Sequence, residues 1–117
     1  MAQVVTPAVL LPRFTSIVGI GAFPSLPIEV TAFQRANLTV WRGPMIGTST
    51  AISIAFLEST DRNTWFEIKP AISPLENVET PVQLSFDRRW FRVVVHLVGT
   101  NPGVTCWVQG FFVNREE

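Results

Sequence analysis

Few side chains in this sequence combine the type and the spacing that catalysis needs. His96 is the only histidine, and no Cys, Asp or Glu stands at metal-ligand spacing from it, so we expect a structural or surface role. Glu58 and Asp61 could form a carboxylate pair, but they flank a predicted hairpin turn, where solvated acids are ordinary. The stretch Gly19-Ile20-Gly21 lacks the rest of a nucleotide-binding fingerprint. We therefore predict that the protein is not an enzyme and that it has no catalytic residue, no cofactor and no metal site.

The side chains best suited to binding are tryptophans and arginines. An exposed Trp can stack on a carbohydrate ring or anchor a protein interface, and the sequence has four Trp, nine Phe and no Tyr. Eight of the nine basic residues are Arg, whose planar guanidinium makes several fixed hydrogen bonds and suits interfaces. We expect Trp65 and Trp107 to fill the core or its edge. The predicted interface residues are Trp41, Arg42, Arg89, Trp90, Phe14 and Ile17.

Composition narrows the choice of partner. Nine basic residues balance nine acidic ones, so no broad positive field favours nucleic acid. The apolar run from Phe14 to Phe23 is too short to cross a membrane, and the first residues do not form a signal peptide. Hydrophobic residues make up 47% and charged residues 15%, which indicates either burial against other subunits or a well-packed, weakly charged β domain. Cys106 is the only cysteine, and its apolar neighbours predict an inert core thiol.

The elements that must position these residues are short strands. Helical periodicity is almost absent, and β-branched and aromatic runs alternate with Pro, Gly, Asn and Asp. In the run Trp90 to Val98, side chains alternate between the two faces of a strand. The predicted core face carries Phe91, Val93, Val95 and Leu97, and Arg92 lies on the opposite face. We expect a loop at Met45 to Ser49 and a turn at Gly99 to Gly103. The predicted fold is all-β: an antiparallel sandwich or jelly roll of about seven or eight strands.

The chain is expected to divide into two parts. Residues 1–27 contain four prolines, each of which removes a backbone donor from a ladder, so we predict an extended N-terminal arm. The arm could add a strand to a neighbour or wrap its own domain. Residues 28–117 are predicted to form the β-sandwich domain.

One hairpin carries a resemblance to known proteins. The segment Ser59-x-Asp61-x-x-x-Trp65 resembles the S-x-D-G-x-x-W hairpin of galactose-binding-like (discoidin-type) jelly rolls. The stretch Arg89-Trp90-Phe91-Arg92-Val93 is similar to their later R-Y-[VI]-R-[LV] strand, and small bacteriophage virion proteins with sandwich folds carry a similar pair. The resemblance covers residues 51–113, with Arg62 standing where the family has Gly.

The motif residues have structural tasks rather than ligand-binding ones. Asp61 and Ser59 can accept backbone N–H groups of their own turn, and Trp65 can bury its indole against the sheet. Arg92 is expected to reach an acidic or carbonyl partner. The N-terminal half lacks the loops that bind sugars or lipids in the discoidin-type relatives, so no family binding residue is carried over.

Two functions remain open from the sequence. The first is a non-enzymatic structural subunit of a large assembly: a bacteriophage virion protein, in a head-surface (decoration) or head–tail position. Its partners would be copies of itself and other virion proteins, within a virion assembled in the host cytoplasm. The alternative is a carbohydrate-binding sandwich module that contacts glycan through Trp41 and Trp90.

Overall fold

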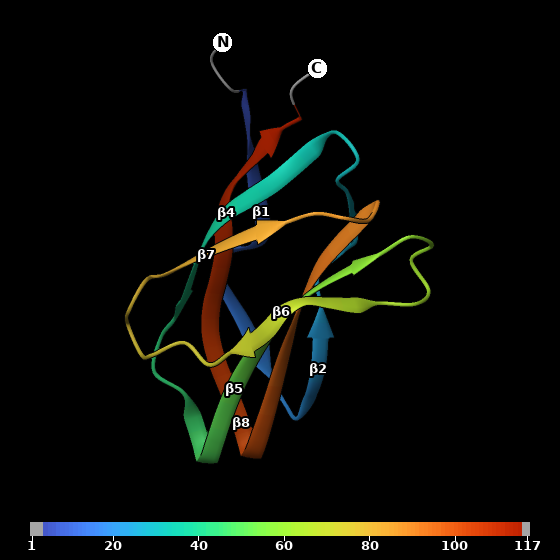
Figure 1. Ribbon diagram of the computed structural model, residues 1–117. Helices are drawn as coiled ribbons and strands as arrows, with labels where there is room; N and C mark the ends of the chain where they lie inside the picture. The colour runs from blue at the N-terminus through green and yellow to red at the C-terminus, as the bar shows by residue number, and fades with distance from the viewer. Residues whose placement is uncertain (1–3, 116–117) are drawn as a thin grey trace.

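The computed structural model describes residues 4–115 of the 117-residue chain, and all regular structure in that range is β-strand (Figure 1). No helix that could cross a membrane occurs within residues 4–115. The predicted all-β fold is confirmed. Its strands are β1 (Val5–Val18), β2 (Gly21–Pro24), β3 (Ile28–Glu29), β4 (Phe33–Arg42), β5 (Ile46–Ser59), β6 (Phe66–Ile72), β7 (Thr80–Ser85) and β8 (Trp90–Asn114).

β8 is the central strand, and two long stretches of chain run antiparallel to it. On one side β1, β2 and β3 follow it from Val113 to Trp90. On the other side β4 pairs with its second half and β5 with its first half. β7 adds to β4 and β6 adds to β5, which gives the order β6-β5-β8-β4-β7. Three long antiparallel stretches therefore form the backbone of the fold.

These stretches bend together, so the sheet folds over into two layers. β1, the second half of β8, β4 and β7 form one layer, and β2, β3, the first half of β8, β5 and β6 form the other. Figure 1 shows β5 and β8 bending at the foot of the view. The rings of Phe91 and Phe112, from the two halves of β8, meet edge to face at 6.4 Å between centroids. The layers thus face each other as in a β-sandwich.

The bend uses residues with left-handed backbone conformations. Gly99 has φ 131° and Gly47 has φ 99°, and Asn101 has φ 50°, a value that Asn tolerates better than most residues. A Cβ on Gly47 would lie 2.6 Å from the carbonyl oxygens of Thr100 and Asn101. The loop predicted at Met45–Ser49 and the turn predicted at Gly99–Gly103 are therefore wrong in part. Both lie largely in strand, because these residues bend the chain while the pairing of β5 with β8 continues.

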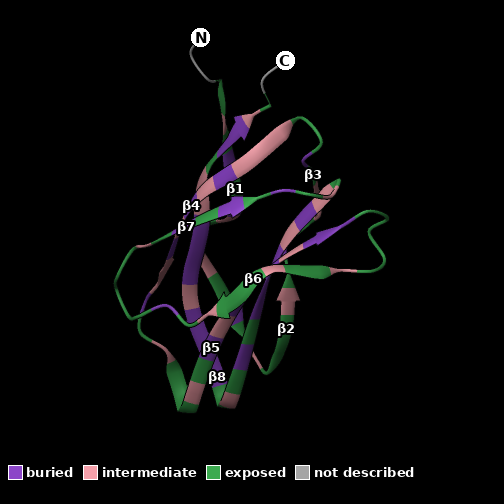
Figure 2. Ribbon diagram, in the orientation of Figure 1, coloured by how far each residue is buried: buried purple, intermediate pink, exposed green. Residues whose placement is uncertain are grey.

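The core between the layers follows the expected alternation. Phe91, Val93, Val95 and Leu97 are all fully buried, as their spacing predicts. The same alternation buries one face of β4, and it buries Ile52, Ile54 and Phe56 on β5, where Ala55 on the opposite face is buried as well (Figure 2). Cys106 is also fully buried, and burial raises the pKa of its thiol to about 11. The prediction of an inert core thiol agrees with this environment.

The N-terminal segment lies along its own domain. Residues 5–18 are extended and pair with β8, and the side chains of Ala8, Leu10 and Ile17 belong to the common core. At the Pro24–Ile28 link, Ser25 exchanges two hydrogen bonds with Val93, at 2.7 and 2.9 Å. Wrapping the domain is one of the two positions that the sequence suggested for residues 1–27. Addition of this segment to a neighbour stays a prediction, and residues 1–3 lie outside the described range.

Candidate interaction surfaces

The hairpin between β5 and β6 has the capped turn that its sequence predicts. The Asp61 carboxylate accepts hydrogen bonds from the backbone N–H groups of Asn63 at 2.8 Å and Thr64 at 2.9 Å. The Ser59 hydroxyl accepts from the N–H groups of Asp61 and Arg62. The bonds from Thr64, Asn63 and Ser59 lower the pKa of Asp61 below its ordinary value of 3.8. The turn is thus a structural device held by its own side chains.

Arginines stack on tryptophans around this hairpin. The guanidinium of Arg62, in the turn, lies 4.5 Å from the ring centroid of Trp90. The guanidinium of Arg92 lies 4.2 Å from the ring centroid of Trp65. The acidic or carbonyl partner expected for Arg92 is not found among the described residues, where its buried Nε has no hydrogen-bond acceptor. The aromatic face of Trp65 takes that place.

Two predicted interface arginines contact groups of their own chain. Arg42 is largely buried, donates to the Pro74 carbonyl at 2.9 Å, and lies 3.9 Å from the Glu76 carboxylate. It therefore fastens the crossover between β6 and β7 to β4. Arg89 is more exposed and pairs with Glu29 at 2.6 Å, beside Trp90. Their part in contacts between chains stays a prediction.

The residues weighed for catalysis have ordinary surroundings. Glu58 is buried and accepts from the Arg88 guanidinium at 2.8 Å and from the Asp87 backbone N–H at 3.0 Å. His96 is exposed on β8. Within residues 4–115 no three His, Cys, Asp or Glu side chains lie together as a metal site would require.

A hollow beside β4 and β8 gathers several aromatic and polar side chains. Trp41 and Trp107, which are cross-strand partners, stack with centroids 6.2 Å apart and planes 13° apart. The guanidinium of Arg13 covers Trp107 at 4.7 Å. The hollow holds about 390 Å³, and its lining is Arg13, Phe14, Trp41, Asn77, Glu79 and Trp107. Phe14 has φ 63°, an uncommon backbone for a bulky residue, and its ring is exposed.

Trp41 and Trp90, both predicted as interface residues, lie in different parts of the fold. Trp90 begins β8 next to Ser59, whereas Trp41 lies opposite Trp107 in the other half of β8. The sequence could not reveal this, because the register between distant strands decides which Trp residues meet.

Exposed apolar side chains gather on the N-terminal segment and around the bend. We call the bend region, residues 16–22, 44–52 and 96–104, the closed end; it lies at the foot of Figure 1. Four large aliphatic side chains are exposed there: Val18 (72%), Ile20 (67%), Ile46 (64%) and Val98 (52%). The strand register brings them together. Val18 and Ile46 both pair with Gly103, from opposite sides of β8. Ile20 immediately precedes Gly21, which pairs with Leu97, the neighbour of Val98.

The closed end contains no Asp, Glu, Lys or Arg. The sequence runs without these residues from 14 to 28, from 43 to 57 and from 93 to 114. The fold places the middle of all three runs at the bend, so charge is confined to the rest of the molecule. Val18, Ile20, Ile46 and Val98 were not among the predicted interface residues, although the three runs without charged residues are visible in the sequence.

Comparison with known proteins extends the fold assignment. No protein-family model and no curated protein matches the sequence. Among solved structures, a chain in the structure of the infectious bursal disease virus Gx strain is similar, with a TM-score of 0.60 and 4% sequence identity. The similarity covers 96% of this chain and 32% of that chain, so the present chain spans about a third of its length. At this identity the similarity defines a shared β-sandwich architecture.

Proposed function

We propose that this chain is a non-enzymatic structural subunit of a virus particle that acts by contacting copies of itself and other virion proteins. The observation that carries the proposal is the charge-free closed end with its exposed aliphatic side chains. Exposed apolar side chains gathered in one region mark interaction sites on proteins. The fold similarity to a chain of a virus structure supports the same conclusion.

The finer proposal is a bacteriophage virion protein, in a head-surface, decoration or head–tail position. It is supported by the resemblance of the Ser59–Trp65 hairpin and the Arg89–Val93 strand to small phage virion proteins. The segment before residue 28 would add contacts, because Val4, Val5 and Val9 expose apolar side chains along it. Pro7 and Pro12 lie in β1 and limit open-ended addition of further strands to this sheet edge.

The test is whether the chain belongs to particles in a fixed ratio. Particles from the source of this sequence would be banded by density and washed in high salt, and their proteins would be quantified by mass spectrometry. We expect a constant copy number per particle that the wash does not change. Absence from the particles, or a copy number that falls with each wash, would contradict the proposal.

The second candidate is a carbohydrate-binding module, and the hollow at Trp41 is the observation that favours it. Aromatic rings beside Asn77, Glu79 and Arg13 offer a stacking face with hydrogen-bonding groups around it. On a glycan array, Trp41→Ala should lose binding, whereas Trp90→Ala, outside the hollow, should retain it. No glycan binding by the unmodified chain would exclude this candidate.

A further inference from the structure

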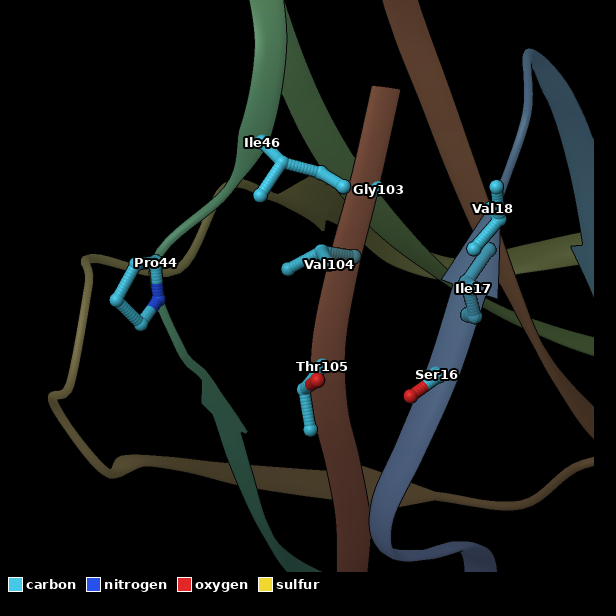
Figure 3. Close-up of a pocket in the computed structure, with 8 residues that line it drawn as sticks. All are labelled: Ser16, Ile17, Val18, Pro44, Ile46, Gly103, Val104 and Thr105. Carbon is cyan, nitrogen blue, oxygen red and sulfur yellow. The ribbon is translucent and has the colours of Figure 1, made fainter. Parts of the chain in front are cut away.

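The closed end combines a protruding side chain and a hollow on one surface. The hollow, of about 130 Å³, is lined by Ser16, Ile17, Val18, Pro44, Ile46, Gly103, Val104 and Thr105 (Figure 3). Ile46 and Val18 stand on opposite sides of the Gly103 stretch of β8 (Figure 3). For scale, an engineered apolar cavity of about 150 Å³ accommodates a benzene ring. The hollow thus has room for about one aliphatic side chain.

Gly103 makes this hollow possible. A Cβ at Gly103 would lie 2.8 Å from Cγ1 of Ile46, so only the missing side chain lets Ile46 lie against β8. Ile20 follows Val18, which lines the hollow, by two residues, and its side chain is 67% exposed. The N–H of Gly19 donates to the Pro102 carbonyl at 2.9 Å, which holds the chain before Ile20 next to the Gly103 stretch. A knob and a hole on the same patch are what a two-fold interface needs, because each copy contributes both.

Charge favours a second copy as the occupant. Two identical charged surfaces repel each other, whereas the closed end has no Asp, Glu, Lys or Arg and can face its own copy without that cost. A lipid surface fits less well, because Thr48, Ser49 and Asn101 lie at the bend among the aliphatic side chains. Polar and backbone groups there would lose water in a bilayer without gaining partners. A protein surface can supply such partners.

We propose that two copies of this chain associate closed end to closed end, with Ile20 of each copy entering the hollow beside Gly103 of the other. This inference deepens the proposed structural role and rests on it, because it names the surface through which copies meet. The contact buries the exposed aliphatic side chains of both copies.

The test is sedimentation velocity of the full chain over a concentration series up to about 1 mM, a range that reaches weak association. Ile20→Ser should raise the dissociation constant at least about tenfold, because both copies lose a buried aliphatic side chain. The matched control is Leu26→Ser, since Leu26 is 85% exposed and lies outside the closed end. That control should change the constant less than about twofold.

A second variant keeps the test decisive if Ile20→Ser folds poorly. Thr48→Asp places a charge on an exposed bend residue, and like charges on facing closed ends should also weaken association at least about tenfold. Circular dichroism and thermal unfolding confirm that each variant is folded.

Unchanged association in Ile20→Ser and Thr48→Asp would overturn the inference, as would a strictly monomeric unmodified chain. Incorporation into virus particles is measured separately. A chain that enters particles but stays monomeric alone would refute this contact and leave the proposed function standing.

Discussion

At the residue scale, the Ser59–Trp65 hairpin shows how local side chains fix a turn. Arg62 has φ 66°, and it occupies the position that is Gly in the discoidin-type hairpins it resembles. A left-handed conformation costs a residue with a Cβ about 1–2 kcal/mol. The contact of its guanidinium with Trp90 offsets part of this cost, since exposed cation–π pairs contribute about 0.5–1 kcal/mol.

Arg62→Ala should therefore be less stable than Arg62→Gly. The Ala variant keeps the unfavourable φ and loses the stacked guanidinium, whereas the Gly variant loses only the stacking. We expect a difference of about 1 kcal/mol in the free energy of unfolding, measured by urea denaturation with equal m-values. An Ala variant as stable as the Gly variant, or more so, would show that the turn does not impose this backbone.

The charge of Asp61 should stabilise the turn in a pH-dependent way. Hydrogen bonds from Thr64, Asn63 and Ser59 hold its folded-state pKa below the unfolded value. The stabilisation is therefore complete above the unfolded pKa and disappears as the pH falls through the lower folded pKa. The stability gap between the unmodified chain and Asp61→Asn should be constant near neutrality and should shrink below the ordinary pKa of 3.8. Thermal unfolding over a pH series measures the gap, and a gap independent of pH would contradict this account.

The sequence was informative at this scale where the interaction is local. Ser59 and Asp61 contact groups two or three residues away, so their types alone predicted the capped turn. Arg92 shows the opposite case. Its partner Trp65 lies just before β6 and far from it in the sequence, and an acidic or carbonyl partner was predicted where a stacked ring is found.

At the element scale, the N-terminal segment can act as an integral strand of its own domain or as an arm that reaches a neighbour. Leu10 faces the core and Val9 faces solvent, although they are adjacent in β1. Leu10→Ala should lower the free energy of unfolding by about 2–5 kcal/mol, because it leaves a cavity in the shared core. Val9→Ala, the matched surface change, should have an effect within about 0.5 kcal/mol.

The pair of variants separates an integral strand from a detachable arm. If β1 leaves the domain to pair with a neighbour, an isolated chain should tolerate Leu10→Ala as well as Val9→Ala. Equal, small effects in denaturant unfolding would therefore favour the arm. A large effect of Leu10→Ala alone would favour an integral strand.

Most strands could be predicted from the sequence, but their bends could not. Alternation in Trp90–Val98 gave the core face correctly, because a half-buried strand repeats every two residues. A loop was predicted around Gly47 and a turn around Gly99 where the strands bend, since a glycine permits each of these conformations. Only the pairing partner decides between them, and β5 continues to pair with β8 through this region.

At the scale of the whole molecule, charge is segregated along an elongated sandwich. The described chain measures 50 × 29 × 20 Å, with the closed end at the foot of the view (Figure 1). The Glu29–Arg89 ion pair and Arg62 lie at Trp90, the first residue of β8, away from the bend. The overall hydrophobic content does not predict this separation of charged residues from the closed end. It follows from three charge-free runs that the topology brings to one place. We infer that this end meets other chains.

The salt dependence of self-association tests this claim most directly. Sedimentation velocity would give the dissociation constant of the unmodified chain from about 0.1 M to about 1 M salt, over which the screening length falls from about 10 Å to about 3 Å. Contact through the charge-free closed end predicts a constant that stays unchanged or falls, because salt does not weaken apolar burial. A constant that rises steeply with salt would place the contact on the charged part of the molecule and contradict the account.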